Sequence, residues 1–294
     1  MQNVWRAENT QKGRFREFMQ CDIDTVGTTN LLADAEILAI VAKSYQQLGF
    51  SNYKIVINDR QIFAGLDTKA ITIIDKLQKI GEDAVIAELA KINVTKEQFE
   101  AVKNADIPQN LQEIIEVAQT LGVSEKILQF DPTLARGLDY YTGLIFEVVS
   151  DDYPVGSLCS GGRYDKLVGM FSTNDIPAVG CAFGFDRTIE AMDSLSLFPA
   201  GLSTTKILVT IFSKDLAKTS LEVSTQLREK GIQTELYLDP TAKMDKQLKY
   251  ADKKNIPYVA IIGPDEAKDN TITLKTMATR EQKTISIDTL VSNL

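Results

Sequence analysis

The spacing of apolar residues changes several times along this chain, and each change predicts a different structural element. Apolar and polar side chains alternate from Phe18 to Gly27, which is the period of a β-strand with one buried face. Residues 4–8 and a turn at Gly13 precede this strand, so the two segments are predicted to form an antiparallel hairpin. Apolar residues then follow a helical period over 33–48. The chain is therefore expected to open with a strand pair and a helix.

Two further strands and a long helical stretch are predicted in the middle of the chain. The strands, at 53–58 and 144–149, are rich in β-branched and aromatic residues. Between them the pattern is helical from 68 to 123, and we interpret this stretch as a small helical insertion. Residues 159–165 contain two consecutive glycines and are predicted to form a glycine turn that opens a helix.

The last third of the chain shows a different order of elements. Strand and helix patterns alternate there as βαβαβ, which predicts a parallel sheet with right-handed crossovers. The predicted strands lie at 207–211, 234–237 and 258–262, and the predicted helices at 217–230 and 243–254. A further strand at 271–275 and a last helix are expected in the tail.

Length and pattern together predict a mixed α/β (α+β) chain with two domains, since 294 residues are enough for two separate cores. The expected first domain comprises 1–66 and 124–198, and the helical insertion at 67–123 interrupts it. Residues 199–205 form a linker, and 206–294 form the second domain.

Composition narrows the classes of function. No run of eighteen apolar residues is present, so no membrane span is expected. The three cysteines, Cys21, Cys159 and Cys181, are scattered and odd in number, which argues against a disulfide framework and favours the reducing cytoplasm. The sequence contains no histidine, which excludes Ser-His-Asp triads, histidine general bases and histidine-ligated metals. The cysteine spacing offers no zinc site.

Charge is distributed unevenly along the chain. The net charge of −8 disfavours a nucleic-acid partner for the chain as a whole. Residues 206–294, however, hold 14 Lys and Arg against 12 Asp and Glu, so the acidity lies in the N-terminal part. The C-terminal part permits local contacts with phosphate groups without requiring them.

Three distant segments that bear arginine are the strongest chemical signal. Arg6 and Arg14 flank the predicted hairpin loop, Arg136 precedes a glycine, and Arg187 follows the glycine-rich residues 180–184. A guanidinium group has a planar fork of donors and does not deprotonate at working pH, so it suits polyphosphate and the charge that develops on an attacked phosphorus atom. The segments together predict one site that binds ATP and activates a carboxylate.

Four blocks resemble the histidyl-tRNA synthetase family of class II aminoacyl-tRNA synthetases. Residues 5–18 are similar to motif 2 of that class and 180–187 to motif 3, while 136–141 and 161–165 are similar to the two histidine-specific motifs of the family. The C-terminal unit looks like the family's anticodon-binding domain. The resemblance implies a class II antiparallel sheet with flanking helices. It also implies ATP-dependent activation of histidine to histidyl-adenylate and its transfer to tRNA(His). Magnesium would enter with ATP as substrate, with no permanent cofactor and no metal site.

On the ATP side, the resemblance implies a cationic cradle with an aromatic lid on the base. Arg6 would hold the α-phosphate and share in catalysis, Glu8 would accept from the adenine amino group, Phe18 would stack on the adenine, Arg14 and Arg187 would grip the outer phosphates, and Gly184 would let the backbone pass beneath the adenosine. Without the resemblance, these arginines would be interpreted as surface residues.

On the histidine side, Gln20 and Asp24 are predicted to share a face of their strand because their separation is even. The resemblance implies that Gln20 contacts the α-amino group and Asp24 the imidazole. Arg136 is the implied catalytic residue beside the reacting carboxylate. The implied pocket is completed by Tyr140, Tyr141, Tyr164 and Gly162. An extended backbone would direct the two consecutive tyrosines to opposite faces, with Tyr141 at the imidazole.

A basic stripe is predicted on the helix at 243–254, where lysines recur at helical spacing: Lys243, Lys246, Lys249 and Lys253. Such a stripe is as compatible with a solvated helix face as with RNA. The resemblance to an anticodon-binding domain favours tRNA.

The family's motif 1, and its segment that holds the histidine α-amino group, are not found ahead of residue 5. We therefore expect an N-terminally truncated polypeptide whose activity alone is weak or absent, with exposed strand edges. The homodimer expected for full-length members is doubtful for this chain. Two alternatives stay open: a non-catalytic, synthetase-like regulatory paralogue, and a tRNA-binding remnant.

Overall fold

The computed structural model describes residues 1–7, 9–10, 15–136, 140–199, 204–286 and 289–290. Contacts divide the chain into two compact units, Met1–Leu197 and Phe198–Leu294, and each is described by itself. Among the described residues, no helix is both long and apolar enough to cross a lipid bilayer.

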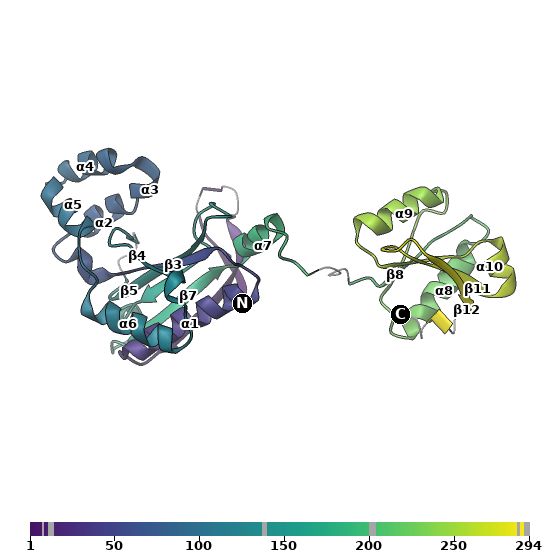
Figure 1. The fold of residues 1–294 in the computed structure, drawn as a ribbon, viewed down its shortest axis with the longest axis horizontal. Helices are drawn as coiled ribbons and strands as arrows, with labels where there is room; N and C mark the ends of the chain where they lie inside the picture. The colour runs from purple at the N-terminus through teal and green to yellow at the C-terminus, as the bar shows by residue number, and fades with distance from the viewer. Residues whose placement is uncertain (8, 11–14, 137–139, 200–203, 287–288, 291–294) are drawn as a thin grey trace. The chain divides into compact units, whose positions relative to one another are not determined.

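A seven-stranded sheet forms the centre of the first unit (Figure 1). Its strands are β1 (Gln2–Trp5), β2 (Glu17–Val26), β3 (Tyr53–Asp59), β4 (Leu128–Phe130), β5 (Leu144–Ser150), β6 (Cys159–Arg163) and β7 (Ala178–Gly184). Their order across the sheet is β1-β2-β7-β6-β5-β3-β4, and every neighbouring pair is antiparallel except β3 and β4. The predicted hairpin of β1 and β2 is confirmed.

Helices cover one face of this sheet. α1 (Leu31–Gln47) and α6 (Gln109–Thr120) lie side by side beneath it in Figure 1, and α1 also packs on β7. The Asn30 side chain begins α1 by accepting a hydrogen bond from the Leu32 N–H at 2.9 Å, which satisfies one of the free donors of its first turn. Tyr45 of α1 is completely buried, and its ring lies 5.8 Å from that of Phe183. This face is the apolar core side of the sheet.

The opposite face is only partly covered. The short helices of the predicted insertion, α2 (Thr68–Ile74), α3 (Leu77–Ile80), α4 (Glu82–Ala90) and α5 (Lys96–Lys103), gather over one end of the sheet. Their buried residues, with Phe99 among the largest, form one apolar cluster with Val56 of β3 and Ile145 of β5. α6 falls in the predicted insertion 67–123 but packs against α1.

The prediction for residues 159–165 is wrong: Cys159–Arg163 is the strand β6, between β5 and β7. The glycines serve close packing of strands here and do not make a turn. A β-carbon on Gly161 would collide with the Gly180 carbonyl and would lie 2.6 Å from the β-carbon of Cys181. The helix that was expected to follow is α7 (Phe185–Ser194), which begins only after β7.

The second unit contains a five-stranded sheet in the order β12-β11-β10-β8-β9. Its strands are β8 (Ile207–Val209), β9 (Thr234–Leu236), β10 (Tyr258–Ile261), β11 (Thr271–Thr276) and β12 (Gln282–Ser286). The first three are parallel and are connected through α8 (Ala217–Glu229) and α9 (Met244–Lys253), so the predicted βαβαβ order is confirmed. The sequence analysis missed α10 (Pro264–Asp269) and β12.

Candidate functional site

The exposed face of β2 carries a row of polar side chains that continues across the sheet. Alternate residues of a strand share a face, so Gln20, Asp22 and Asp24 project together, as predicted for the first and last. Asp22 pairs with Ala182 on β7, Ala182 pairs with Ser160 on β6, and Ser160 pairs with Glu147 on β5. Directly paired residues also share a face. Four strands therefore contribute to one polar surface, opposite the face that α1 covers.

Small residues keep the floor of this surface low. Gly180 pairs with Asp24, and a β-carbon on Gly180 would collide with the Asp24 carboxylate. Gly162 pairs with Gly180, and a β-carbon on Gly162 would lie 2.9 Å from the ring of Tyr141. The glycines thus allow Asp24 and Tyr141 to lie directly over the backbone of the neighbouring strands.

Arg6 lies at the β2 end of the polar surface. Its guanidinium donates to Gln20 Oε1 at 3.0 Å and lies 5.0 Å from the centre of the Phe18 ring, a cation–π arrangement. Gln20 in turn donates to Asp22 at 2.8 Å. The structure therefore brings together three residues that the resemblance assigned to ATP and histidine. Two others, Glu8 and Arg14, lie outside the described residues.

Arg136 lies over the middle of the sheet, on the same face. Its guanidinium donates to Glu147 Oε2 at 3.3 Å and to Ser160 Oγ at 3.0 Å. Both members of the Arg136–Glu147 ion pair keep about a quarter of their side-chain surface exposed. Burial raises the pKa of Glu147, and the charge of Arg136 opposes that rise. The arrangement fixes one cation in place while leaving it accessible to a ligand.

Arg187 on α7 is connected to this pair through Ser157. Its Nη1 donates to the Ser157 carbonyl at 2.7 Å, while the Ser157 hydroxyl makes a hydrogen bond with Glu147 that lowers the pKa of that carboxyl. Gly156 has a φ of +73°, and a β-carbon there would lie 3.1 Å from Arg187 Nη1. The loop between β5 and β6 thus links Arg187 to the partner of Arg136.

Three tyrosines lie at the other end of the polar surface. The Tyr164 hydroxyl donates to the Asp24 carboxylate, and burial together with this carboxylate raises the pKa of Tyr164. The Tyr140 ring lies 6.3 Å from Tyr164 and 4.5 Å from Tyr141. The prediction that Tyr140 and Tyr141 point to opposite faces is wrong, because the backbone turns at Tyr140. Tyr141 is 7% exposed and belongs to the apolar cluster, whereas Tyr140 is only partly buried.

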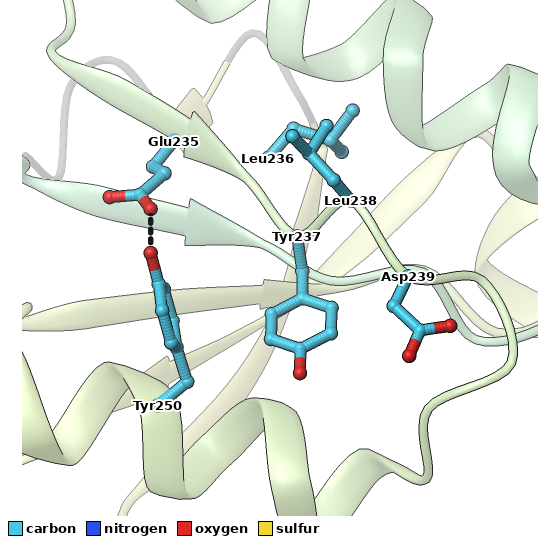
Figure 2. A pocket seen from close by; sticks show the side chains of 6 residues that line it. All are labelled: Glu235, Leu236, Tyr237, Leu238, Asp239 and Tyr250. Atoms are coloured by element: carbon cyan, nitrogen blue, oxygen red, sulfur yellow. Dashed lines mark hydrogen bonds between the residues drawn. The ribbon is translucent and has the colours of Figure 1, made fainter.

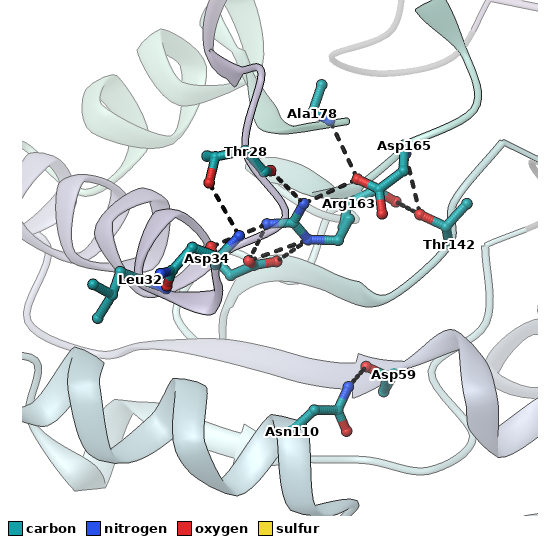
Figure 3. A network of polar contacts seen from close by, with 10 residues as sticks. Thr28, Leu32, Asp34, Asp59, Asn110, Thr142, Arg163, Asp165 and Ala178 are labelled. Carbon is teal, nitrogen blue, oxygen red and sulfur yellow. Dashed lines mark hydrogen bonds and ion pairs between the residues drawn. The ribbon is translucent and has the colours of Figure 1, made fainter. Parts of the chain in front are cut away.

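Sequence reasoning missed Arg163, which has the most extensive buried hydrogen bonding near the site (Figure 3). Its Nε donates to both oxygens of Asp34 at 3.0 and 3.2 Å, and its Nη2 also binds this carboxylate. Its Nη1 donates to the Thr28 carbonyl at 3.0 Å and to Asp165 at 2.9 Å. The Asp165 N–H donates to the Thr142 hydroxyl at 3.1 Å, next to Tyr141. Arg163 thus connects the start of α1 with both tyrosine-bearing segments.

Glu147 and Ser160 were also missed as partners of Arg136. A polar residue within an otherwise apolar strand pattern is the signal for Glu147. Ser160 carries no such signal, since its position depends on the register between β5 and β6.

In the second unit, α9 carries the predicted lysine stripe among acidic partners. Lys249 pairs with Asp245 at 2.8 Å, and Lys246 lies 4.0 Å from Asp239. The stripe is therefore partly neutralised, and its remaining members are Lys243 at the N-cap and Lys253 in the last turn.

A hollow of about 350 Å³ lies between β9 and α9 (Figure 2). The rings of Tyr237 and Tyr250 line it edge to face, 5.4 Å apart, and Leu238 beside them is 84% exposed. Tyr250 donates to Glu235, which also pairs with Lys254 at 3.1 Å. Exposed aromatic and apolar groups of this kind are typical of surfaces that bind unstacked bases.

Among the residues that the structure describes, no group of three or more acidic or cysteine side chains is placed to hold a metal ion. The cationic groups of the first unit, and not a carboxylate cluster, are the feature that faces the polar surface.

Two sequence profiles match the chain: one described as "Histidyl-tRNA synthetase" over residues 58–188, and one described as "Anticodon binding domain" over residues 206–294. The chain is similar to the histidine–tRNA ligase of Cytophaga hutchinsonii, with 37% identity over 100% of this chain and 72% of that protein. It is 36% identical to that of Clostridium tetani, over 97% of this chain and 73% of that protein.

Solved structures give the same picture. A histidyl-tRNA synthetase from Nostoc sp. PCC 7120 superposes with a TM-score of 0.75 and 30% identity, over 100% of this chain and 76% of that one. The apo enzyme from S. aureus gives a TM-score of 0.64 and 25% identity, over 99% and 71% of the two chains.

Proposed function

This chain belongs to the histidyl-tRNA synthetase family, and on that premise we propose that the polar surface of its seven-stranded sheet activates histidine with ATP. The observation that carries the proposal is the placement of Arg6 and Arg136 on one face of the sheet, together with the Asp24–Tyr164 pair. Two cations and a pocket rich in hydroxyl groups are the elements that an aminoacyl-adenylate requires.

In the proposed reaction, a carboxylate oxygen of histidine attacks the α-phosphorus of ATP. The bond to the bridging oxygen breaks, pyrophosphate leaves with the electron pair, and histidyl-adenylate remains. Negative charge on the α-phosphate oxygens is concentrated in the pentavalent transition state. Arg136 meets this charge without reorganising, because Glu147 and Ser160 already hold its guanidinium.

ATP is proposed to lie toward the β2 edge of the polar surface. Arg6 binds its α-phosphate, and Phe18 offers a ring face to the adenine. Arg187 supports the outer phosphates, Glu8 and Arg14 complete the ATP contacts, and Gly184 lies beneath the adenosine. Magnesium accompanies ATP as part of the substrate.

The imidazole of histidine is proposed to bind between Asp24 and the tyrosines. A carboxylate accepts from an imidazole N–H, and Tyr164 fixes this carboxylate from the other side. Tyr140 lies beside Tyr164 and is less buried than Tyr141, so it is the more accessible of the consecutive pair. Gln20 binds the α-amino group.

The second unit is an anticodon-binding domain, and we propose that it holds tRNA(His) while the adenylate is transferred to the terminal ribose. Lys243, Lys246, Lys249 and Lys253 would contact backbone phosphates of the tRNA, which gives binding without base specificity. The reaction is proposed to take place in the cytoplasm.

Histidine-dependent exchange of labelled pyrophosphate into ATP tests the proposal. The purified chain is expected to catalyse exchange with histidine and not with the other standard amino acids. Histidine binding without any exchange would favour the regulatory paralogue, and tRNA binding unaffected by ATP and histidine would favour the remnant. The size of the rate also decides whether this chain alone is weakly active.

A further inference from the structure

Asn58 is a completely buried amide at the end of β3, and it holds the backbone of a distant loop. Its Nδ2 donates to the Pro132 carbonyl at 2.9 Å and to the Leu134 carbonyl at 3.0 Å. Its Oδ1 is buried and has no hydrogen-bond partner among the described residues. An amide has two N–H donors on one nitrogen, which matches two adjacent carbonyls. Both donors are therefore used on one short stretch of chain.

That stretch is the loop between β4 and Arg136. Asp131 begins it by donating its N–H to the Ile57 carbonyl at 3.1 Å, next to Asn58 on β3. The Asp131 carboxylate then accepts from the N–H and the hydroxyl of Thr133 at 2.8 and 2.6 Å. The Leu134 N–H returns to the Asp131 carbonyl at 3.0 Å, which closes a turn. The loop thus has an internal brace at Asp131 and one side-chain clamp from the sheet at Asn58.

We infer that Asn58 is a positioning residue for Arg136, which acts by fixing the loop that presents this guanidinium to Glu147 and Ser160. Arg136 follows Leu134 by two residues, and the side chains of Leu134 and Ala135 are buried. Asn58 pairs with Ile145, two residues before Glu147 on the adjacent strand β5. The clamp and the partners of Arg136 are therefore built on neighbouring strands, so their separation is rigid.

A buried amide with one unpaired oxygen is less stabilising than an apolar side chain of the same size in an apolar surrounding. At this position an apolar residue would leave two carbonyls without donors. The unpaired oxygen is accepted here because the two donors fix one loop conformation. This inference rests on the proposed function, since it assigns Asn58 a part in the activation of histidine.

The test compares Asn58→Asp with two matched variants. The carboxylate has the shape of the amide but no N–H donor when ionised, so it repels both carbonyls. Gln247→Glu makes the same chemical change in the second unit, where Gln247 is also completely buried and donates to the Ile211 and Ala242 carbonyls. Tyr53→Phe removes a bond from the same strand β3 to the Ala42 carbonyl, on the α1 side. The first control matches the chemistry, and the second matches the loss of stability in the first unit.

Pyrophosphate exchange is measured well below the melting temperature of every variant. Asn58→Asp is expected to lower kcat roughly ten- to hundredfold with little change in the KM values for ATP and histidine, because displacing a catalytic group by about 1 Å acts in the transition state. Gln247→Glu and Tyr53→Phe are expected to keep the wild-type kcat. If Asn58→Asp does not fold, Asn58→Ser, which keeps one donor, is expected to give a smaller loss of the same kind.

Hydrogen–deuterium exchange of the peptide 131–136 provides a readout that does not need activity. Faster exchange there in Asn58→Asp, and in neither control, supports the clamp. Unchanged exchange of this peptide, or a kcat equal to that of Tyr53→Phe, overturns the inference. If the wild-type chain itself shows no pyrophosphate exchange, the proposed function fails, while faster deuterium uptake in the peptide still supports the placement of Arg136 by Asn58.

Discussion

Removing the carboxylate of Asp34 is expected to destabilise the first unit more than most single substitutions. Asp34 is 0% exposed and Arg163 is 5% exposed, so their ion pair is shielded from water. Three donor–acceptor contacts join the guanidinium to this carboxylate. In Asp34→Ala, Arg163 stays buried and keeps only its contacts with Asp165 and the carbonyls of the turn after β2. Breaking a buried pair in this way costs about 3–5 kcal/mol.

The expected change in melting temperature follows from the size of the unit. For a domain of about 150–250 residues, each kcal/mol lowers Tm by about 2–4 °C. Asp34→Ala should therefore lower the Tm of the first unit by roughly 6–20 °C. Calorimetry of the whole chain measures this, provided that the transition of the second unit is identified separately. The C-terminal pair Lys254–Glu235 is more exposed, so Lys254→Ala is a suitable control and should change Tm little.

A double substitution separates the charge effect from the loss of packing. Asp34→Leu with Arg163→Met replaces the pair by apolar groups of similar size and should recover most of the stability that Asp34→Leu alone loses. The reasoning is refuted if Asp34→Ala lowers stability by less than about 1 kcal/mol, the range of exposed pairs. It is also refuted if the two single losses simply add in the double variant.

The remaining predictions concern the proposed site. Burial raises the pKa of Glu147, whose charged neighbours are Arg136, Asp75 and Asp131, so activity should fall as the pH drops through this raised pKa; Glu147→Gln should be less active and lack this acid limb in a pH–rate profile, whereas Asp75→Asn should keep it. Tyr164→Phe, which loses a hydrogen bond to a carboxylate, should raise the KM for histidine roughly ten- to hundredfold without affecting that for ATP, and an equal rise in both would contradict the assignment. Lys243→Glu with Lys253→Glu should raise the KM for tRNA in aminoacylation and leave pyrophosphate exchange unchanged; an unchanged KM for tRNA would favour a solvated stripe.

Local periodicity predicted the elements whose pattern is set by near neighbours. The period of two along β2 placed Gln20 and Asp24 on one face, and β2 has this geometry. The βαβαβ order of the second unit was also predictable, because each strand and helix is bounded by its own pattern. The pair Gly161-Gly162 misled the interpretation, since glycine serves a turn and a close strand contact equally well.

The contacts of the site could not be predicted because they depend on register between distant segments. Glu147 and Ser160 lie opposite each other only through the pairing of β5 with β6. Asp34 and Arg163 are separated by 129 positions, and no periodicity links them. Asp34 looks like an ordinary acidic residue in the first turn of a helix, which is favourable there in any case. The resemblance identified the arginines, whereas the groups that hold them come from the fold.

The most direct test of the central claim is the effect of Arg136→Ala on turnover relative to ATP binding. The account predicts that kcat for pyrophosphate exchange falls about 10²–10³-fold while the Kd for ATP changes only slightly, because the guanidinium acts mainly on charge that develops in the transition state. Arg228→Ala, in the second unit, should change neither. Equal losses in kcat and in ATP affinity would place Arg136 in ground-state binding, and an unchanged kcat would contradict the proposed site altogether.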